Sequence, residues 1–80
     1  MKKVNISSYE YKIGQNIARL RKATGLSQAD MEDYGISRAY YGKIELGLHN
    51  ITLSKMKLIA HALGVTCSSL FRDENDRDIV

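Results

Sequence analysis

The sequence predicts an all-α protein, a compact bundle of about five short helices. Three observations support this: apolar residues recur at helical spacing, glycines follow the ends of these runs, and strand-like alternation never exceeds about four residues. Eighty residues suit one domain, which we place at residues 1–80. Its core is expected at about 8–71, followed by an acidic tail at 72–80.

The first helix is predicted to begin near Ser7, which opens an S-x-x-E capping box. Ile13, Ile17 and Leu20 then recur at i, i+4 and i+7, the spacing of one apolar helix face. Gly25 is expected to end this helix in the left-handed conformation that glycine adopts without strain.

A second helix is predicted to begin at Ser27, because Asp30 follows three residues later and allows reciprocal capping of the backbone. Gly35 supplies a tight turn after this short helix. Ile36 is expected to fill the corner between this helix and the next one.

The third helix is predicted to run from the N-cap Ser37 to about Leu46. Tyr41 and Ile44 give it one narrow apolar stripe. Small residues and long cations occupy its other face, namely Arg38, Ala39, Gly42 and Lys43. Such a face allows close approach to a DNA duplex while hydrogen-bond donors reach base edges.

The C-terminal half is predicted to form a loop at 47–52, a fourth helix and a short fifth helix. The fourth helix runs from about Thr52 or Leu53 to Leu63, with Gly64 ending it. Its apolar face comprises Leu53, Met56, Ile59, Ala60 and Leu63. Val65, Leu70 and Phe71 indicate the fifth helix, and the last eight or so residues are expected to fray.

Composition indicates a cytoplasmic protein with a basic body. The single Cys67 excludes an intramolecular disulfide, and no apolar run approaches the ~18 residues that a membrane span needs. Residues 1–71 hold ten Lys and Arg against five Asp and Glu, a net charge of +5, whereas residues 72–80 carry −2. A basic body favours polyanionic partners, although an ordinary solvated surface is the alternative.

Three segments carry a resemblance to a known family: IGQNIARLRKATGLSQ, GISRAYYGKIELG and ITLSKMKLIAHALGV. Over roughly residues 13–71 they resemble the Xre family of helix-turn-helix proteins, which includes phage repressors and Cro proteins. The resemblance implies a lambda-repressor-like domain whose third helix lies in the major groove. It also implies an ion pair between Arg21 and Glu45 and a phosphate contact at Gln28. The run IELGLHNITL further looks like the controller proteins of restriction–modification systems.

The chain departs from that family's pattern in the second helix. The stretch from Gln28 to Gly35 is one residue shorter than usual, and Glu32 stands where a small residue normally crosses the third helix. We expect the shortened stretch to change the angle between the two helices.

The candidate DNA contacts lie mainly on the third helix and in the loop after it. Arg38 and Lys43 are expected to contact bases or phosphates, the alternative being solvated cations. The Tyr40 hydroxyl either contacts a phosphate or packs partly on the surface. The complete set is Gln28, Ser37, Arg38, Ala39, Tyr40, Gly42, Lys43, His49, Asn50 and Lys55. Other Lys and Arg residues of the first helix are expected to add salt-sensitive affinity.

Enzymatic and metal-dependent functions are not supported by the sequence. His49, His61 and Cys67 have spacings that match no zinc pattern, and no Gly-rich phosphate loop is present. A five-helix body of this size offers little room for a catalytic pocket. We therefore expect no enzyme, no metal, no cofactor and no small-molecule ligand.

The predicted function is sequence-specific regulation of transcription by a homodimer on double-stranded DNA. The dimer interface is expected at Leu58, Leu70, Phe71, Ile79 and Val80. A protein-binding module, such as the antitoxin of a toxin–antitoxin pair, is the alternative, and it should need residues 72–80. A nucleoid protein without sequence preference fits less well, because its basic surface should be denser.

Overall fold

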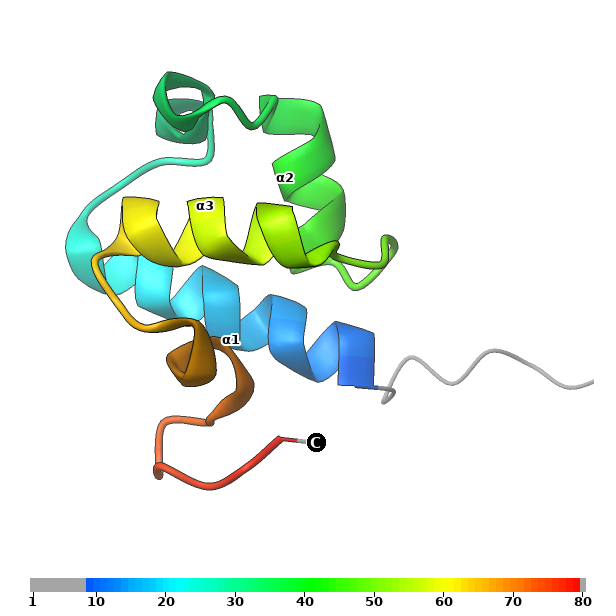
Figure 1. The fold of residues 1–80 in the computed structure, drawn as a ribbon, viewed down its shortest axis with the longest axis vertical. Coiled ribbons are helices and arrows are strands. Elements are labelled where there is room, and N and C mark those ends of the chain that lie inside the picture. Colours follow the sequence, from blue (N-terminus) through cyan, green and yellow to red (C-terminus); the bar gives the residue numbers. More distant parts are fainter. Residues whose placement is uncertain (1–8, 80) are drawn as a thin grey trace, which may run out of the picture.

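The computed structural model describes residues 9–79 and confirms the all-α prediction (Figure 1). Within these residues the chain forms three α-helices and two 3₁₀ helices. In chain order they are α1 (Tyr9–Thr24), η1 (Ala29–Tyr34), α2 (Arg38–Glu45), α3 (Leu53–Leu63) and η2 (Cys67–Phe71). The predicted helix start at Ser7 lies outside the described residues. In Figure 1, η1 and α2 form one end of the molecule, and η2 with the C-terminal residues forms the other.

The second helix is a short 3₁₀ helix, and its predicted reciprocal cap is confirmed. The Ser27 N–H donates to Asp30 Oδ2 at 2.8 Å, and the Asp30 N–H donates to Ser27 Oγ at 3.2 Å. Gly35 ends the helix with a φ of 82°, a left-handed conformation that only glycine adopts freely. Ile36 is buried, as the corner position after this turn predicts.

The core lies between α1, α2 and α3, with η1 and η2 covering its two ends. Its fully buried large side chains are Ile17, Met31, Ile36, Tyr41, Ile44, Ile59 and Leu70. Each element thus contributes to one apolar cluster, and helical periodicity predicted the contributions of α1, α2 and α3 but not that of Met31 in η1. Leu53 is the exception, because at the first position of α3 its side chain is 68% exposed. The prediction that Leu53 belongs to the apolar face is therefore wrong.

Gly14 allows α1 and α2 to approach each other more closely than side chains would permit. A Cβ atom at this position would overlap the carbonyl oxygen of Ile44 and lie 2.7 Å from that of Glu45. These are backbone atoms at the C-terminal end of α2 and cannot rotate away. The orientation of α2 on the body of the protein therefore depends on the absence of a side chain at Gly14.

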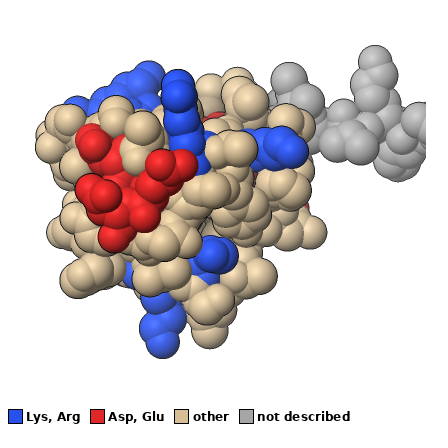
Figure 2. Space-filling view, turned by 90° about the horizontal axis from the view of Figure 1, so that it is seen from above, with Lys and Arg blue, Asp and Glu red and all other residues tan. Residues whose placement is uncertain are grey.

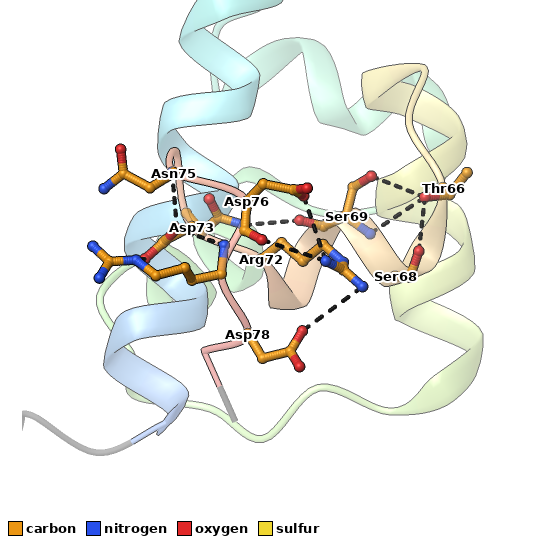
Figure 3. A network of polar contacts seen from close by, with 10 residues as sticks. Thr66, Ser68, Ser69, Arg72, Asp73, Asn75, Asp76 and Asp78 are labelled. Atoms are coloured by element: carbon orange, nitrogen blue, oxygen red, sulfur yellow. Dashed lines mark hydrogen bonds and ion pairs between the residues drawn. The ribbon is translucent and has the colours of Figure 1, made fainter.

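The C-terminal residues fold back along η2 rather than fraying, so the prediction of a frayed tail is wrong. The Ile79 N–H donates to the Phe71 carbonyl at 2.7 Å, and Arg72 pairs with Asp78 in an antiparallel bridge. Sequence reasoning treated this segment as a run of charges. The charges instead form a local network, because Arg72 lies within ion-pair distance of both Asp76 and Asp78 (Figure 3).

Asp73 organises the turn of this C-terminal segment. Its Oδ1 atom accepts from the backbone N–H groups of Arg77 at 3.0 Å and Asn75 at 2.8 Å (Figure 3). These bonds favour the ionised form, so they hold the pKa of Asp73 below its ordinary value. Asn16 of α1 joins that helix to η2, because its buried side-chain amide donates to the backbone carbonyls of Ser69 and Leu70.

The predicted dimer surface requires one clear correction. Leu70 is completely buried in the core, where it packs within its own protomer and is unavailable to a partner. Phe71 and Ile79 are half-buried against the same core, whereas Leu58 is 37% exposed on α3. Val80 lies outside the described residues.

Candidate nucleic-acid interface

The outer face of α2 combines exposed cations with small residues. Ser37 begins the helix, and its Oγ accepts the Tyr40 N–H at 3.1 Å, as the N-cap prediction requires. Tyr41, Ile44 and Glu45 point inward and are buried. The outward positions are Arg38, Ala39, Gly42 and Lys43, which are exposed apart from the half-buried glycine. The helix therefore presents two cations flanking a shallow surface.

A buried ion pair fixes the inner face of α2 against α1. Arg21 Nε donates to Glu45 Oε2 at 2.7 Å, and Arg21 Nη2 donates to Glu45 Oε1 at 3.3 Å. The side chains are only 11% and 7% exposed. The same guanidinium donates through Nη1 to the Leu26 carbonyl at 2.8 Å, which also attaches the segment leading to η1.

The pair has clear consequences for the ionisation of its members. Burial disfavours the Glu45 carboxylate, but hydrogen bonds from Arg21 and Gln28 outweigh it and lower the pKa of Glu45. The hydrogen bond to Glu45 raises the pKa of Arg21. Burial also raises the pKa of Tyr41 far above its ordinary value. The Tyr41 hydroxyl makes no hydrogen bond within the described part of the chain.

Gln28 and Glu32 connect η1 to α2. Gln28 Nε2 donates to Glu45 Oε1 at 2.9 Å, so one of its two amide hydrogens is already engaged. Glu32 Oε2 accepts the Arg38 N–H at 3.3 Å and so pairs with the N-terminal end of α2. The residue that departs from the family's small-residue pattern is therefore used as an extra cap.

Three candidate residues from separate segments meet on one side of α2. The rings of Tyr40 and His49 lie 5.2 Å apart at 37°, and Lys55 Nζ lies 5.7 Å from the Tyr40 ring centroid. Thr52 positions the lysine, since its Oγ1 accepts the Lys55 N–H at 3.2 Å. Asn50 is exposed in the same loop. The structure thus joins α2, the following loop and α3 into one polar edge.

The other side of α2 borders a hollow of about 1120 Å³ that it shares with α1 and η1. Four positions of α1 line it, namely Gln15, Ala18, Arg19 and Lys22. They recur at i, i+3, i+4 and i+7, which is one helix face. Sequence reasoning did not place Arg19 or Lys22 among the candidate site residues. The signal was their shared spacing, but without the packing of α1 nothing showed that this face borders α2.

Carboxylates gather on the outward side of η1, next to the candidate interface. Asp30, Glu32 and Asp33 belong to this helix, and the last two are exposed. Figure 2 looks onto this end of the molecule and shows a compact acidic patch with separate Lys and Arg side chains around it. The basic character of this end therefore belongs to α2 and the neighbouring face of α1.

The described residues contain neither a candidate metal-binding cluster nor a candidate membrane-spanning helix. Among residues 9–79, no group of three or more His, Cys, Asp or Glu side chains is placed to hold a metal ion. His49 packs against Tyr40 and His61 against Tyr34, so the two imidazoles belong to different clusters. Within the same range, no helix has the length and apolar character needed to cross a membrane.

This architecture of a short helix, a glycine turn and an exposed basic helix is that of a DNA-binding helix-turn-helix domain. The chain belongs to the helix-turn-helix family, whose model matches residues 17–70. That family consists of DNA-binding regulators rather than enzymes.

Several relatives extend over most of the chain. It is 34% identical over 70 residues to the control protein C.MunI of Mycoplasma sp., covering 85% of this chain and 95% of the relative. It is 35% identical to the immunity repressor protein of Bacillus phage phi105, covering 78% of this chain and 44% of that protein. It is therefore related to both controller and repressor proteins.

A solved structure shows the same arrangement. The restriction-modification controller protein C.AhdI from Aeromonas hydrophila superposes with a TM-score of 0.74 at 37% identity, covering 76% of this chain and 94% of the other. A hypothetical transcription factor, NHTF, from Neisseria superposes with a TM-score of 0.77 at 25% identity, covering 94% and 87%. The chain therefore shares its overall fold with both of these proteins.

Proposed function

We propose that this protein is a sequence-specific transcriptional regulator that binds a pseudo-palindromic operator as a homodimer. The observation that carries the proposal is the outer face of α2, where Arg38 and Lys43 flank Ala39 and Gly42. A helix of this kind enters the major groove, where Arg binds guanine O6 and N7 with about 1–3 kcal/mol of discrimination per bidentate contact.

Two edges of α2 are proposed to hold the phosphates on either side of the groove. The Tyr40, His49 and Lys55 cluster, with Asn50 nearby, provides one edge. Gln28 provides the other through its remaining amide hydrogen and the N-terminal end of η1. Ser37 is foremost the cap of α2. Contacts at these edges fix the position of the helix, and its outward side chains select the sequence.

The first experiment is the selection of bound sequences from a random duplex pool at roughly physiological salt, where non-specific binding is weak. We expect enrichment of a two-fold-symmetric site with half-sites about 34–36 Å apart. A single asymmetric half-site would exclude the symmetric dimer. No enrichment at all would exclude sequence-specific binding.

Replacement of Arg38 by Ala tests the assignment of base contacts. We expect relaxed preference at one base position in each half-site, because the loss of a base contact removes discrimination at that base. The loss of a phosphate contact would instead weaken binding to all sequences equally. Lys55→Gln is the matched variant, and it should weaken all sequences alike. An unchanged base preference in the Arg38 variant would remove Arg38 from the reading surface.

The homodimer is proposed to use the C-terminal side of the domain. After the correction for Leu70, the remaining candidates are the exposed Leu58 and the half-buried Phe71 and Ile79, with Val80 beyond the described range. Leu58→Glu should leave the monomer folded and shift the sedimentation coefficient from dimer to monomer. A variant that stays dimeric would place the interface elsewhere.

A further inference from the structure

We propose that the hollow between α1, η1 and α2 extends the DNA-contacting face of α2 and takes a sugar-phosphate strand along its α1 wall. Lys22 and Arg19 of α1 are its phosphate-binding residues. This inference rests on the proposed function and deepens it, since it names the strand that runs beside the recognition helix. It extends the interface from a single helix and its two edges to a concave surface shared by three elements.

The shape and charge of the hollow fit this occupant. Four cations line it, Arg19 and Lys22 from α1 and Arg38 and Lys43 from α2. Of its two carboxylates, Glu45 is paired with Arg21 and Gln28, and Glu32 lies on the η1 side, where it accepts the Arg38 N–H. Small side chains at Ala18 and Ala39 leave the floor shallow. A polyanionic backbone therefore meets the two α1 cations on the wall opposite the base-reading face of α2.

The acidic patch on η1 decides which way the strand runs. A strand held at Gln28 can continue over the outward side of η1 or pass between η1 and α1. The first route crosses Asp30 and Asp33, which do not line the hollow, and phosphates would be repelled there (Figure 2). The second route leads into the hollow. Attraction on one side and repulsion on the other thus direct the strand along α1.

Lys22 is the more independent of the two cations. Its side chain is exposed in the last turn of α1, where it lines the hollow that borders α2. Arg19 also lines the neighbouring surface beside Asp73, and its guanidinium donates to Asn16 Oδ1. Because Arg19 already has these interactions, its loss should cost less phosphate binding than the loss of Lys22.

The test compares three charge-removing variants, Lys22→Gln, Arg19→Gln and Lys57→Gln, by fluorescence anisotropy with a labelled duplex of random sequence over a range of salt. Lys57 is the matched control, since it is exposed on α3 and does not line the hollow. Loss of one phosphate contact should flatten the slope of log K against log salt by about 0.9, equivalent to roughly eightfold weaker binding at about 0.1 M salt. Circular dichroism melts establish that the variants stay folded.

We expect this flattening for Lys22→Gln, a smaller one for Arg19→Gln and none for Lys57→Gln. If all three slopes equal that of the unmodified protein, the hollow holds no strand, although the proposed operator binding would stand. If the unmodified protein shows no salt-dependent binding at all, the proposed function itself fails. The two failures are therefore distinguishable within one experiment.

Discussion

The two faces of α2 differ in whether packing explains which residues they carry. On the inner face every residue has a packing reason: Tyr41 and Ile44 fill the core, and Glu45 completes a buried ion pair. On the outer face packing explains almost nothing. Gly42 is the clearest case, because a Cβ there would lie 3.7 Å from Gln28 Oε1, an ordinary contact.

Gly14 and Gly42 show the same contrast, because the fold requires glycine at one position and not at the other. At Gly14 a side chain would collide with the backbone of α2, so the fold requires glycine. At Gly42 the fold would accept alanine and be more stable with it, since glycine inside a helix costs about 0.5–1 kcal/mol. Residue identity on the outer face therefore indicates what lies outside the molecule, whereas identity on the inner face indicates what lies within it.

The largest effect is expected on the inner face, from Arg21→Ala. The substitution leaves Glu45 buried without its cation, which should lower the free energy of unfolding by about 3–5 kcal/mol. Urea denaturation at neutral pH measures it. A variant as stable as the unmodified protein would show that the pair does not hold α2 in place.

Gly14→Ala should have the next largest effect. The added Cβ overlaps the Ile44 carbonyl, and separating α1 from α2 to relieve this should cost about 1–3 kcal/mol. The same denaturation experiment measures the loss. Stability equal to that of the unmodified protein would mean that α2 shifts without cost.

A smaller effect is expected from acid, because protonation removes the charge of Glu45 but keeps its side chain in place. Its pKa is lowered in the folded state, so the unfolded chain takes up the proton at higher pH. The stabilisation is therefore complete above the ordinary value of about 4.5 and is lost as pH falls through the lower folded value. Thermal unfolding should show a steeper acid loss for the unmodified protein than for Glu45→Gln. Parallel curves would contradict the assignment.

The smallest effect on folding, and the one of opposite sign, is expected for Gly42→Ala. Unfolding should require about 0.5–1 kcal/mol more free energy, because alanine favours the helix and finds room. Affinity for the selected operator should fall, since the new methyl group faces the approaching duplex. Denaturation and anisotropy measure the two quantities on one preparation. Unchanged affinity would show that DNA does not approach this part of α2.

Local signals in the sequence were sufficient for much of the fold. The reciprocal cap of Ser27 and Asp30 and the N-cap Ser37 depend on residues within one turn, so spacing alone predicted them. Contacts between distant segments were not predictable in this way. The buried position of Leu70 and the fold-back of residues 72–79 depend on Asn16 and Phe71, whose packing no local pattern reveals.

The candidate site was also predictable only where it depends on residues close together in the sequence. The outward positions of α2 followed from helical spacing, but the engagement of the Gln28 amide by Glu45 did not, because it joins residues 17 positions apart. The first helix was expected to add salt-sensitive affinity, but the residues that border α2 were not identified, for the same reason. Arg19 and Lys22 become candidates only when the packing of α1 beside α2 is known.

The 3₁₀ form of η1 has a consequence for the number of residues needed to reach the next helix. A 3₁₀ helix rises about 2.0 Å per residue and an α-helix about 1.5 Å, so the six residues of η1 span roughly the length of eight α-helical residues. The larger rise per residue lets this short stretch of sequence cover the distance from Gln28 to the turn at Gly35. The winding of a short helix can thus supply length that an α-helix would need more residues to reach.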